Sequence, residues 1–298
     1  MKTSITYLYL PLFSLLLLGI LTVGQTEVSA YKHRIHKLPY RSIANSPKAT
    51  RYPLFDDYVH QNHTPIGFRF YFNGKGYDSL IIHENGFVSF GHSNEFNVLS
   101  ARPLSQLTDT DVEGIISAMG TDLAPHQVKQ RSFSQIRSKC LGQPGQRVFV
   151  IEWVQTSFKD FFTYQSTTDT FSFQIQLFEK NQGIRIHYGK FHISEQTRRD
   201  LEIGIRGQFM LDMHSLYMPD GRHDWLEAAL SLHLPTSIWL SSTSFPQEGL
   251  VIEWKPLAID VSKKTGFVDD SKDFWNKKLE TVFQAFASNS YQFILFPG

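Results

Sequence analysis

The sequence has almost no cysteine. Cys140 is the single thiol among 298 residues, so no disulfide can form within the chain. A structural zinc site built from several thiolates is excluded by the same count. Small secreted scaffolds depend on disulfides, so this chain must be stabilised by a large hydrophobic core instead. Cys140 stands in a loop-like stretch, residues 139–142, and we interpret it as an unreactive thiol.

The sequence also lacks an excess of charge of either sign. It contains 29 Lys and Arg against 28 Asp and Glu, which gives a formal net charge of +1. The electrostatic attraction that drives nucleic-acid binding is therefore missing, and we expect no nucleic-acid partner. A neutral protein has to recognise its partners by shape, aromatic contacts and hydrogen bonds.

The first thirty residues differ in composition from the rest of the chain. Lys2 precedes an apolar run at residues 7–23, and residues 28–30 read Val-Ser-Ala, small side chains of the kind that a signal peptidase reads. We predict a signal peptide at residues 1–30, cleaved after Ala30, and a product that is periplasmic, cell-surface or secreted and no longer bound to the membrane. The alternative is an uncleaved anchor, because about eighteen apolar residues can just span a bilayer.

Short alternating segments broken by glycine turns dominate the remainder. The sequence holds 25 Phe and 12 Tyr, residues that favour strands. Residues 66–72, 77–82 and 87–90 alternate around Asn-Gly pairs at 73–74 and 85–86, which is typical of a β-meander. Further strands are predicted at 115–119, 147–153, 170–178, 184–189, 201–207 and 250–254.

This spacing of strands predicts an all-β fold, an antiparallel β-sandwich of jelly-roll or lectin-like type. We expect the sandwich to cover residues 52–260, after an irregular basic lead-in at residues 31–51. Apolar residues at helical spacing predict a C-terminal amphipathic helix within residues 261–298. A short strand at 291–296 completes this tail, which we expect to pack on the sandwich.

Several of these segments have a recognisable order. I-G-F-x-F-x-F-N-G at 66–74 is followed by E-N-G-F-V-S-F-G at 84–91 and by I-E-W at 151–153. Together with residues 173–189, 203–207 and 245–254, this order resembles the nidogen-like β-sandwich module of bacterial secreted and surface proteins. The resemblance covers roughly residues 55–258 and implies an extracellular sandwich. It implies no catalytic residues.

Three glutamates on or beside predicted strands could serve catalysis. Glu152 with Glu179 or Glu253 could act as the acid and base of a glycan-active hydrolase. The E-x-D-x-x-E pattern that jelly-roll hydrolases carry on one strand is missing. We therefore interpret Glu152 as an outward-facing strand residue or one bonded to a neighbouring side chain, and we expect no enzyme.

An acidic stretch offers a weak cation site. Asp109, Asp111 and Glu113 alternate next to a glycine, which suggests calcium, although the EF-hand pattern is not met. The twelve His residues are scattered without an H-E-x-x-H pattern. We expect no cofactor and no metal, with calcium as the alternative.

Aromatic residues between two predicted strands form the candidate ligand site. Phe158, Phe161, Phe162 and Tyr164 lie close together in the sequence, and exposed aromatic rings stack on sugars or grip protein partners. The alternative is that they fold into the core.

These observations predict an exported, non-catalytic protein of the binding or adhesion type, whose ligand is a carbohydrate or another surface protein. A glycan-active hydrolase is the first alternative. A structural component of a cell-envelope assembly is the second.

Overall fold

The structure is a computed structural model, and it describes residues 31–52, 59–91, 101–107, 112–128, 131–159, 168–209 and 211–257. The predicted signal peptide and the predicted C-terminal helix and strand lie outside these residues. Within the described residues, no helix is both long and apolar enough to cross a membrane.

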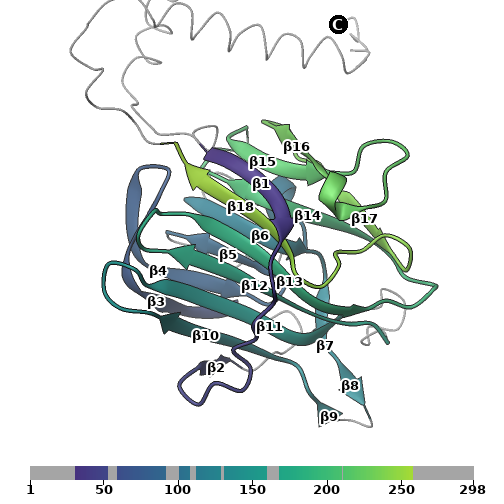
Figure 1. The fold of residues 1–298 in the computed structure, drawn as a ribbon, viewed down its shortest axis with the longest axis horizontal. Coiled ribbons are helices and arrows are strands. Elements are labelled where there is room, and N and C mark those ends of the chain that lie inside the picture. The colour runs from purple at the N-terminus through teal and green to yellow at the C-terminus, as the bar shows by residue number, and fades with distance from the viewer. Residues whose placement is uncertain are drawn as a thin grey trace, which may run out of the picture. The chain divides into compact units, whose positions relative to one another are not determined.

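Two antiparallel sheets face each other (Figure 1). Sheet A has the order β1-β18-β13-β12-β11-β10-β2, with β7 beside β11, and sheet B has the order β16-β15-β14-β6-β5-β4-β3, with β17 beside β14. The predicted antiparallel sandwich is confirmed.

The bounds of the elements follow. Sheet A contains β1 (Tyr31–Lys37), β2 (Thr50–Tyr52), β7 (Leu123–Pro125), β10 (Gln135–Leu141), β11 (Val148–Phe158), β12 (Thr170–Phe178), β13 (Ile184–His192) and β18 (Leu250–Pro256). Sheet B contains β3 (Val59–Phe72), β4 (Lys75–His83), β5 (Phe87–Phe90), β6 (Gly114–Gly120), β14 (Arg198–Arg206), β15 (Met213–Tyr217), β16 (Ala229–Leu232) and β17 (Ile238–Ser241). The short elements are α2 (Pro103–Gln106), β8 (Gln127–Val128), β9 (Arg131–Ser132) and η2 (Trp225–Glu227).

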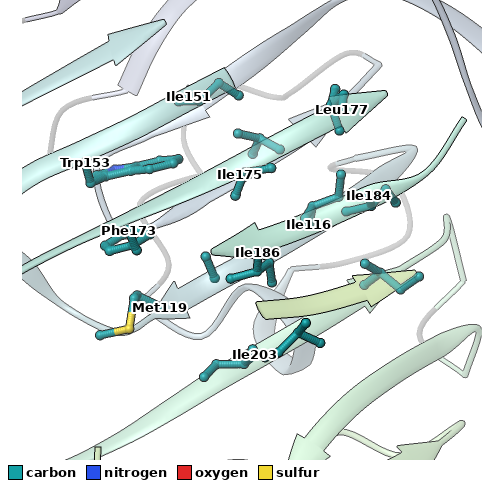
Figure 2. Packing of buried hydrophobic residues seen from close by; sticks show 14 of the residues in the cluster. Ile116, Met119, Ile151, Trp153, Phe173, Ile175, Leu177, Ile184, Ile186 and Ile203 are labelled. Carbon is teal, nitrogen blue, oxygen red and sulfur yellow. The ribbon is translucent and has the colours of Figure 1, made fainter. Parts of the chain in front are cut away.

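The core lies between the two sheets and consists of alternate residues from their strands. Figure 2 shows Trp153, Phe173 and Ile186 of sheet A beside Ile116 and Ile203 of sheet B. The rings of Trp153 and Phe173 stack with their centroids 4.9 Å apart. Each large apolar side chain that is fully buried contributes about 1.5–3 kcal/mol, so such a core can replace the missing disulfides.

The prediction that residues 31–51 form an irregular lead-in is wrong at both ends of that segment. Tyr31–Lys37 forms β1, which pairs antiparallel with β18, and Thr50–Tyr52 forms β2 beside β10. In β1 the side chains of Tyr31 and Ile35 pack against the core. This apolar alternation is hidden in the sequence by the basic residues between them, because an edge strand carries its charges on exposed positions.

Residues 38–49, which we call the strap, cross the outer face of sheet A from β1 to β2 (Figure 1). Glu152 of β11 is buried beneath the strap. It accepts hydrogen bonds from the Tyr40 hydroxyl at 2.7 Å and from the Ile43 backbone N–H at 2.7 Å. Gln174 and His187, on the next two strands, hydrogen-bond to strap carbonyl groups at 2.9 and 3.1 Å.

The outer face of sheet B is held in the same way. Glu202 of β14 is buried and accepts hydrogen bonds from the backbone N–H groups of Leu104 and Ser105 at 2.7 and 3.1 Å. The guanidinium of Arg206, also buried, donates to the carbonyls of Leu104 and Leu107 at 3.1 and 2.6 Å. Burial raises the pKa of Glu202 despite the hydrogen bonds that it accepts. Each sheet therefore anchors a crossing segment on a strand glutamate.

Glu152→Ala should destabilise the protein by about 1–3 kcal/mol, because it leaves the Tyr40 hydroxyl and the Ile43 N–H buried without their acceptor. Urea unfolding followed by tryptophan fluorescence measures the change. Glu195→Ala, at an exposed site, is the matched control and should stay within about 0.5 kcal/mol of the wild type. Equal stability of the two variants would contradict the anchoring role of Glu152.

Candidate functional site

The three candidate catalytic glutamates are each engaged by other groups. Glu179, directly after β12, receives two hydrogen bonds from the guanidinium of Arg147, from Nε at 2.9 Å and from Nη2 at 2.6 Å. These hydrogen bonds lower the pKa of Glu179 to about 2. Glu152 anchors the strap. Both carboxylates therefore have a structural explanation in their contacts.

Glu253 of β18 lies in a charged cluster on the outer face of sheet A. Arg185 donates to it from Nε at 2.8 Å, and His36 lies 3.2 Å away. Burial raises the pKa of Glu253, but the hydrogen bonds and positive charge of Arg185, with smaller contributions from His36 and Lys255, outweigh burial and lower it. Three strand spacings separate β18 from β11, and the pairing sets Glu253 level with Val150, two residues from Glu152, so the two glutamate backbones are roughly 16 Å apart.

Most of the predicted aromatic ligand site cannot be placed. Phe161, Phe162 and Tyr164 lie outside the described residues. Phe158 is fully buried, with its ring centroid 4.6 Å from that of Phe171. The prediction that Phe158 binds a ligand is therefore wrong. It is the last residue of β11, and its side chain belongs to the core.

The predicted calcium ligands are mostly outside the described residues as well, since Asp109 and Asp111 fall there. Glu113 is described, and its carboxylate lies 2.6 Å from the Nζ of Lys75. Among the residues that the structure describes, no three His, Cys, Asp or Glu side chains are grouped so that they could hold a metal ion.

An aromatic platform that the sequence analysis missed lies on sheet B. Trp239 of β17 is 64% exposed, although Ile238 and Leu240 on either side of it are fully buried. The strand alternation places these two in the core and turns the indole outward. The signal was available in the sequence, because Ile-Trp-Leu in a short strand puts the Trp on the wet face.

A charged pair stands beside this indole. Asp200 of β14 lies directly opposite Trp239 in the ladder, where side chains share a face and their Cβ atoms are about 5 Å apart. The Asp200 Oδ2 is 2.6 Å from the Nη2 of Arg102, whose side chain is 45% exposed. The Oδ1 of Asp200 is buried and has no hydrogen-bond partner among the described residues.

The position of this pair depends on the anchored segment of sheet B. Arg102 immediately precedes α2, which Glu202 and Arg206 hold against β14. Asp200 is two residues before Glu202 on the same strand and the same face. One strand therefore supplies both the acid of the platform and the anchor that brings its cation into reach. We define the platform as Trp239, Asp200 and Arg102.

Comparison with known protein families finds a match over residues 30–256 to the family described as NIDO related. The chain belongs to the NIDO-related family. No curated protein and no solved structure matches it. The resemblance to a nidogen-like module is thereby confirmed.

The extent of the NIDO-related match agrees with the architecture. It begins one residue before β1 and ends at the last residue of β18, so it includes the strap and β1. The resemblance seen in the sequence began only near residue 55, because the basic residues of β1 conceal its strand pattern. The platform residues also lie within the NIDO-related module.

Glu179→Gln should make the stability of the NIDO-related module less dependent on pH. The folded pKa of Glu179, about 2, lies below its ordinary value of 4.5. The stability that the Arg147 pair adds is complete above pH 4.5 and is lost as pH falls toward 2. Urea midpoints measured between pH 2 and 6 test this. A variant whose midpoint falls as steeply as that of the wild type would contradict it.

Trp239→Ala should leave the free energy of unfolding within about 0.5 kcal/mol of the wild type, because the indole is mostly in solvent. Trp153→Ala, at a fully buried position, should cost about 3–5 kcal/mol. Urea unfolding of the two variants measures the contrast. A large loss of stability in Trp239→Ala would show that the indole serves the fold.

Proposed function

We propose that this NIDO-related protein is an exported, non-catalytic binding module, and that its ligand is a carbohydrate bound at the platform. The observation that carries the proposal is the exposed indole of Trp239 beside the Asp200–Arg102 pair. The apolar face of a sugar ring stacks on an aromatic ring, and neighbouring charged groups bond its hydroxyls. Trp239 supplies the aromatic ring and Asp200 a charged group, and the two residues are paired across β17 and β14.

Export is part of the same proposal. The expected cleavage after Ala30 would make Tyr31 the first residue of the mature chain, and Tyr31 is also the first residue of β1. Membership of a NIDO-related family supports an extracellular type of module. A core without disulfides suits a bacterial periplasm or cell surface, as the cysteine count indicates.

The hydrolase alternative has less support. Glycoside hydrolases hold their two carboxyl groups roughly 5–10 Å apart on either side of the substrate. The backbones of Glu152 and Glu253 are separated by three strand spacings, and both carboxylates are engaged, Glu152 by the strap and Glu253 by Arg185 and His36. Glu179 is held by Arg147.

A glycan array probed with the purified mature protein tests the proposal. We expect binding to a subset of glycans, and a loss of about fivefold in affinity in Trp239→Ala, because stacking contributes on the order of 1 kcal/mol. Asp200→Asn should lower the affinity for the same glycans without changing which glycans bind. Binding is then quantified by calorimetry.

Tyr71→Ala is the matched control, since Tyr71 is also an exposed aromatic residue but lies on β3. It should bind like the wild type. Silence of the wild-type protein across the array would contradict a carbohydrate ligand and favour a surface-protein ligand. Equal losses in Tyr71→Ala and Trp239→Ala would contradict the placement of the site.

A further inference from the structure

The two sheet paths end in four edge strands, which differ in how they are protected. Exposed edges invite pairing with other chains, and proteins guard them with positive charge, bulges, proline or very short strands. In sheet A, β1 carries Lys32, Arg34 and Lys37, and β2 has three residues with Arg51 at its centre. In sheet B, β3 contains Pro65 and pairs with β4 through two register shifts. These three edges are blocked.

The fourth edge, β16, is also short, with four residues, but it carries no charged residue and no proline. Its sequence is Ala-Leu-Ser-Leu, and it pairs with β15 without a register shift. Leu232, its last residue, is 45% exposed, and Leu211 nearby is 65% exposed. The carbonyl of Leu211 accepts a hydrogen bond of 2.8 Å from His233 Nδ1, so the two apolar side chains lie at the same end of the strand.

The hydrogen-bonding pattern between β16 and β15 shows which backbone groups of β16 face outward. The N–H of His233 donates to the carbonyl of Met213 at 3.0 Å, so His233 and Ser231 direct their backbone groups toward β15. Leu230 and Leu232, at the alternate positions, direct theirs away from it. Among the described strands β16 pairs only with β15.

We propose that a second copy of this chain pairs with the open edge of β16, antiparallel and about a twofold axis through Ser231. Residues opposite each other in an antiparallel ladder share a face. The axis must therefore lie midway between the two copies of one residue. An axis at Ser231 sets Leu230 opposite the partner's Leu232, which buries the exposed leucine. An axis at Leu230 would set Leu232 opposite the partner's Ala228 and fill less space.

A second copy fits this edge better than it fits the edge of β1. Two β1 strands brought together would place Lys32, Arg34 and Lys37 against their own copies, whereas β16 brings no charge to the axis. The backbone N–H and C=O groups of Leu230 and Leu232 point outward in both copies, so those of Leu230 can bond with those of the partner's Leu232. Sheet B then runs continuously through both copies. This pairing goes beyond the proposed function, since it does not involve the platform.

Disulfide trapping tests the register. In the full mature chain with Cys140→Ser, we introduce Ser231→Cys. The two Ser231 residues form a non-hydrogen-bonded pair with Cα atoms about 4.5 Å apart, within the range of a disulfide. We expect most of the protein to become a covalent dimer under mild oxidation.

Two control variants in the same background define the comparison. Leu230→Cys should not cross-link, because in this register the two Leu230 residues are offset along the strands and lie beyond disulfide reach. Lys32→Cys on β1 reports random collisions. Cross-linking of Leu230→Cys in place of Ser231→Cys would overturn the proposed register, and cross-linking of Ser231→Cys no faster than Lys32→Cys would overturn the interface.

Sedimentation velocity gives a test that needs no new cysteine. The wild-type protein should show a monomer–dimer equilibrium, and Leu232→Lys should remove the dimer by placing two like charges beside the axis. Leu257→Lys, at another exposed leucine, should dimerise like the wild type. A wild-type protein that stays monomeric at the highest attainable concentration would refute the proposal.

Discussion

Burial of aromatic and branched side chains between two antiparallel sheets is the interaction on which the rest of this protein depends. With one cysteine in the chain, no disulfide can share this role. Trp153, Phe173 and Trp254 are fully buried, and the alternation that turns them inward also turns the neighbouring residues outward. The outer faces of the sheets, and the platform on one of them, follow from that single constraint.

A two-layer sandwich leaves one face of each sheet without a partner layer, and here connecting segments cover part of both. The strap lies on sheet A and the α2 segment lies on sheet B. Each is held by a buried strand glutamate, Glu152 or Glu202, which accepts hydrogen bonds from backbone N–H groups. A buried carboxylate is stabilised only when such donors surround it. Glu152, which looked catalytic in the sequence, thus serves to fix the strap.

The prediction from sequence succeeded where local patterns dominate. The meander around Asn73-Gly74 and Asn85-Gly86 and the alternating strands of 147–189 are present, because turn chemistry and strand alternation act over a few residues. It failed at β1, where basic residues mask the inward Tyr31 and Ile35. It also failed at Phe158, which ends a strand in the core, since burial there depends on Phe171 from another strand.

The sequence by itself determined an all-β sandwich without covalent cross-links, because hydrophobic alternation, glycine turns and the cysteine count are properties of neighbouring residues or of composition. Only the tertiary structure decided that Trp239 pairs with Asp200 across two strands, that Asp200 forms an ion pair with Arg102, and that β16 lies at the edge of its sheet. These relations join residues up to about a hundred positions apart. They arise from strand order and register, which packing of the whole chain selects and which no local pattern contains.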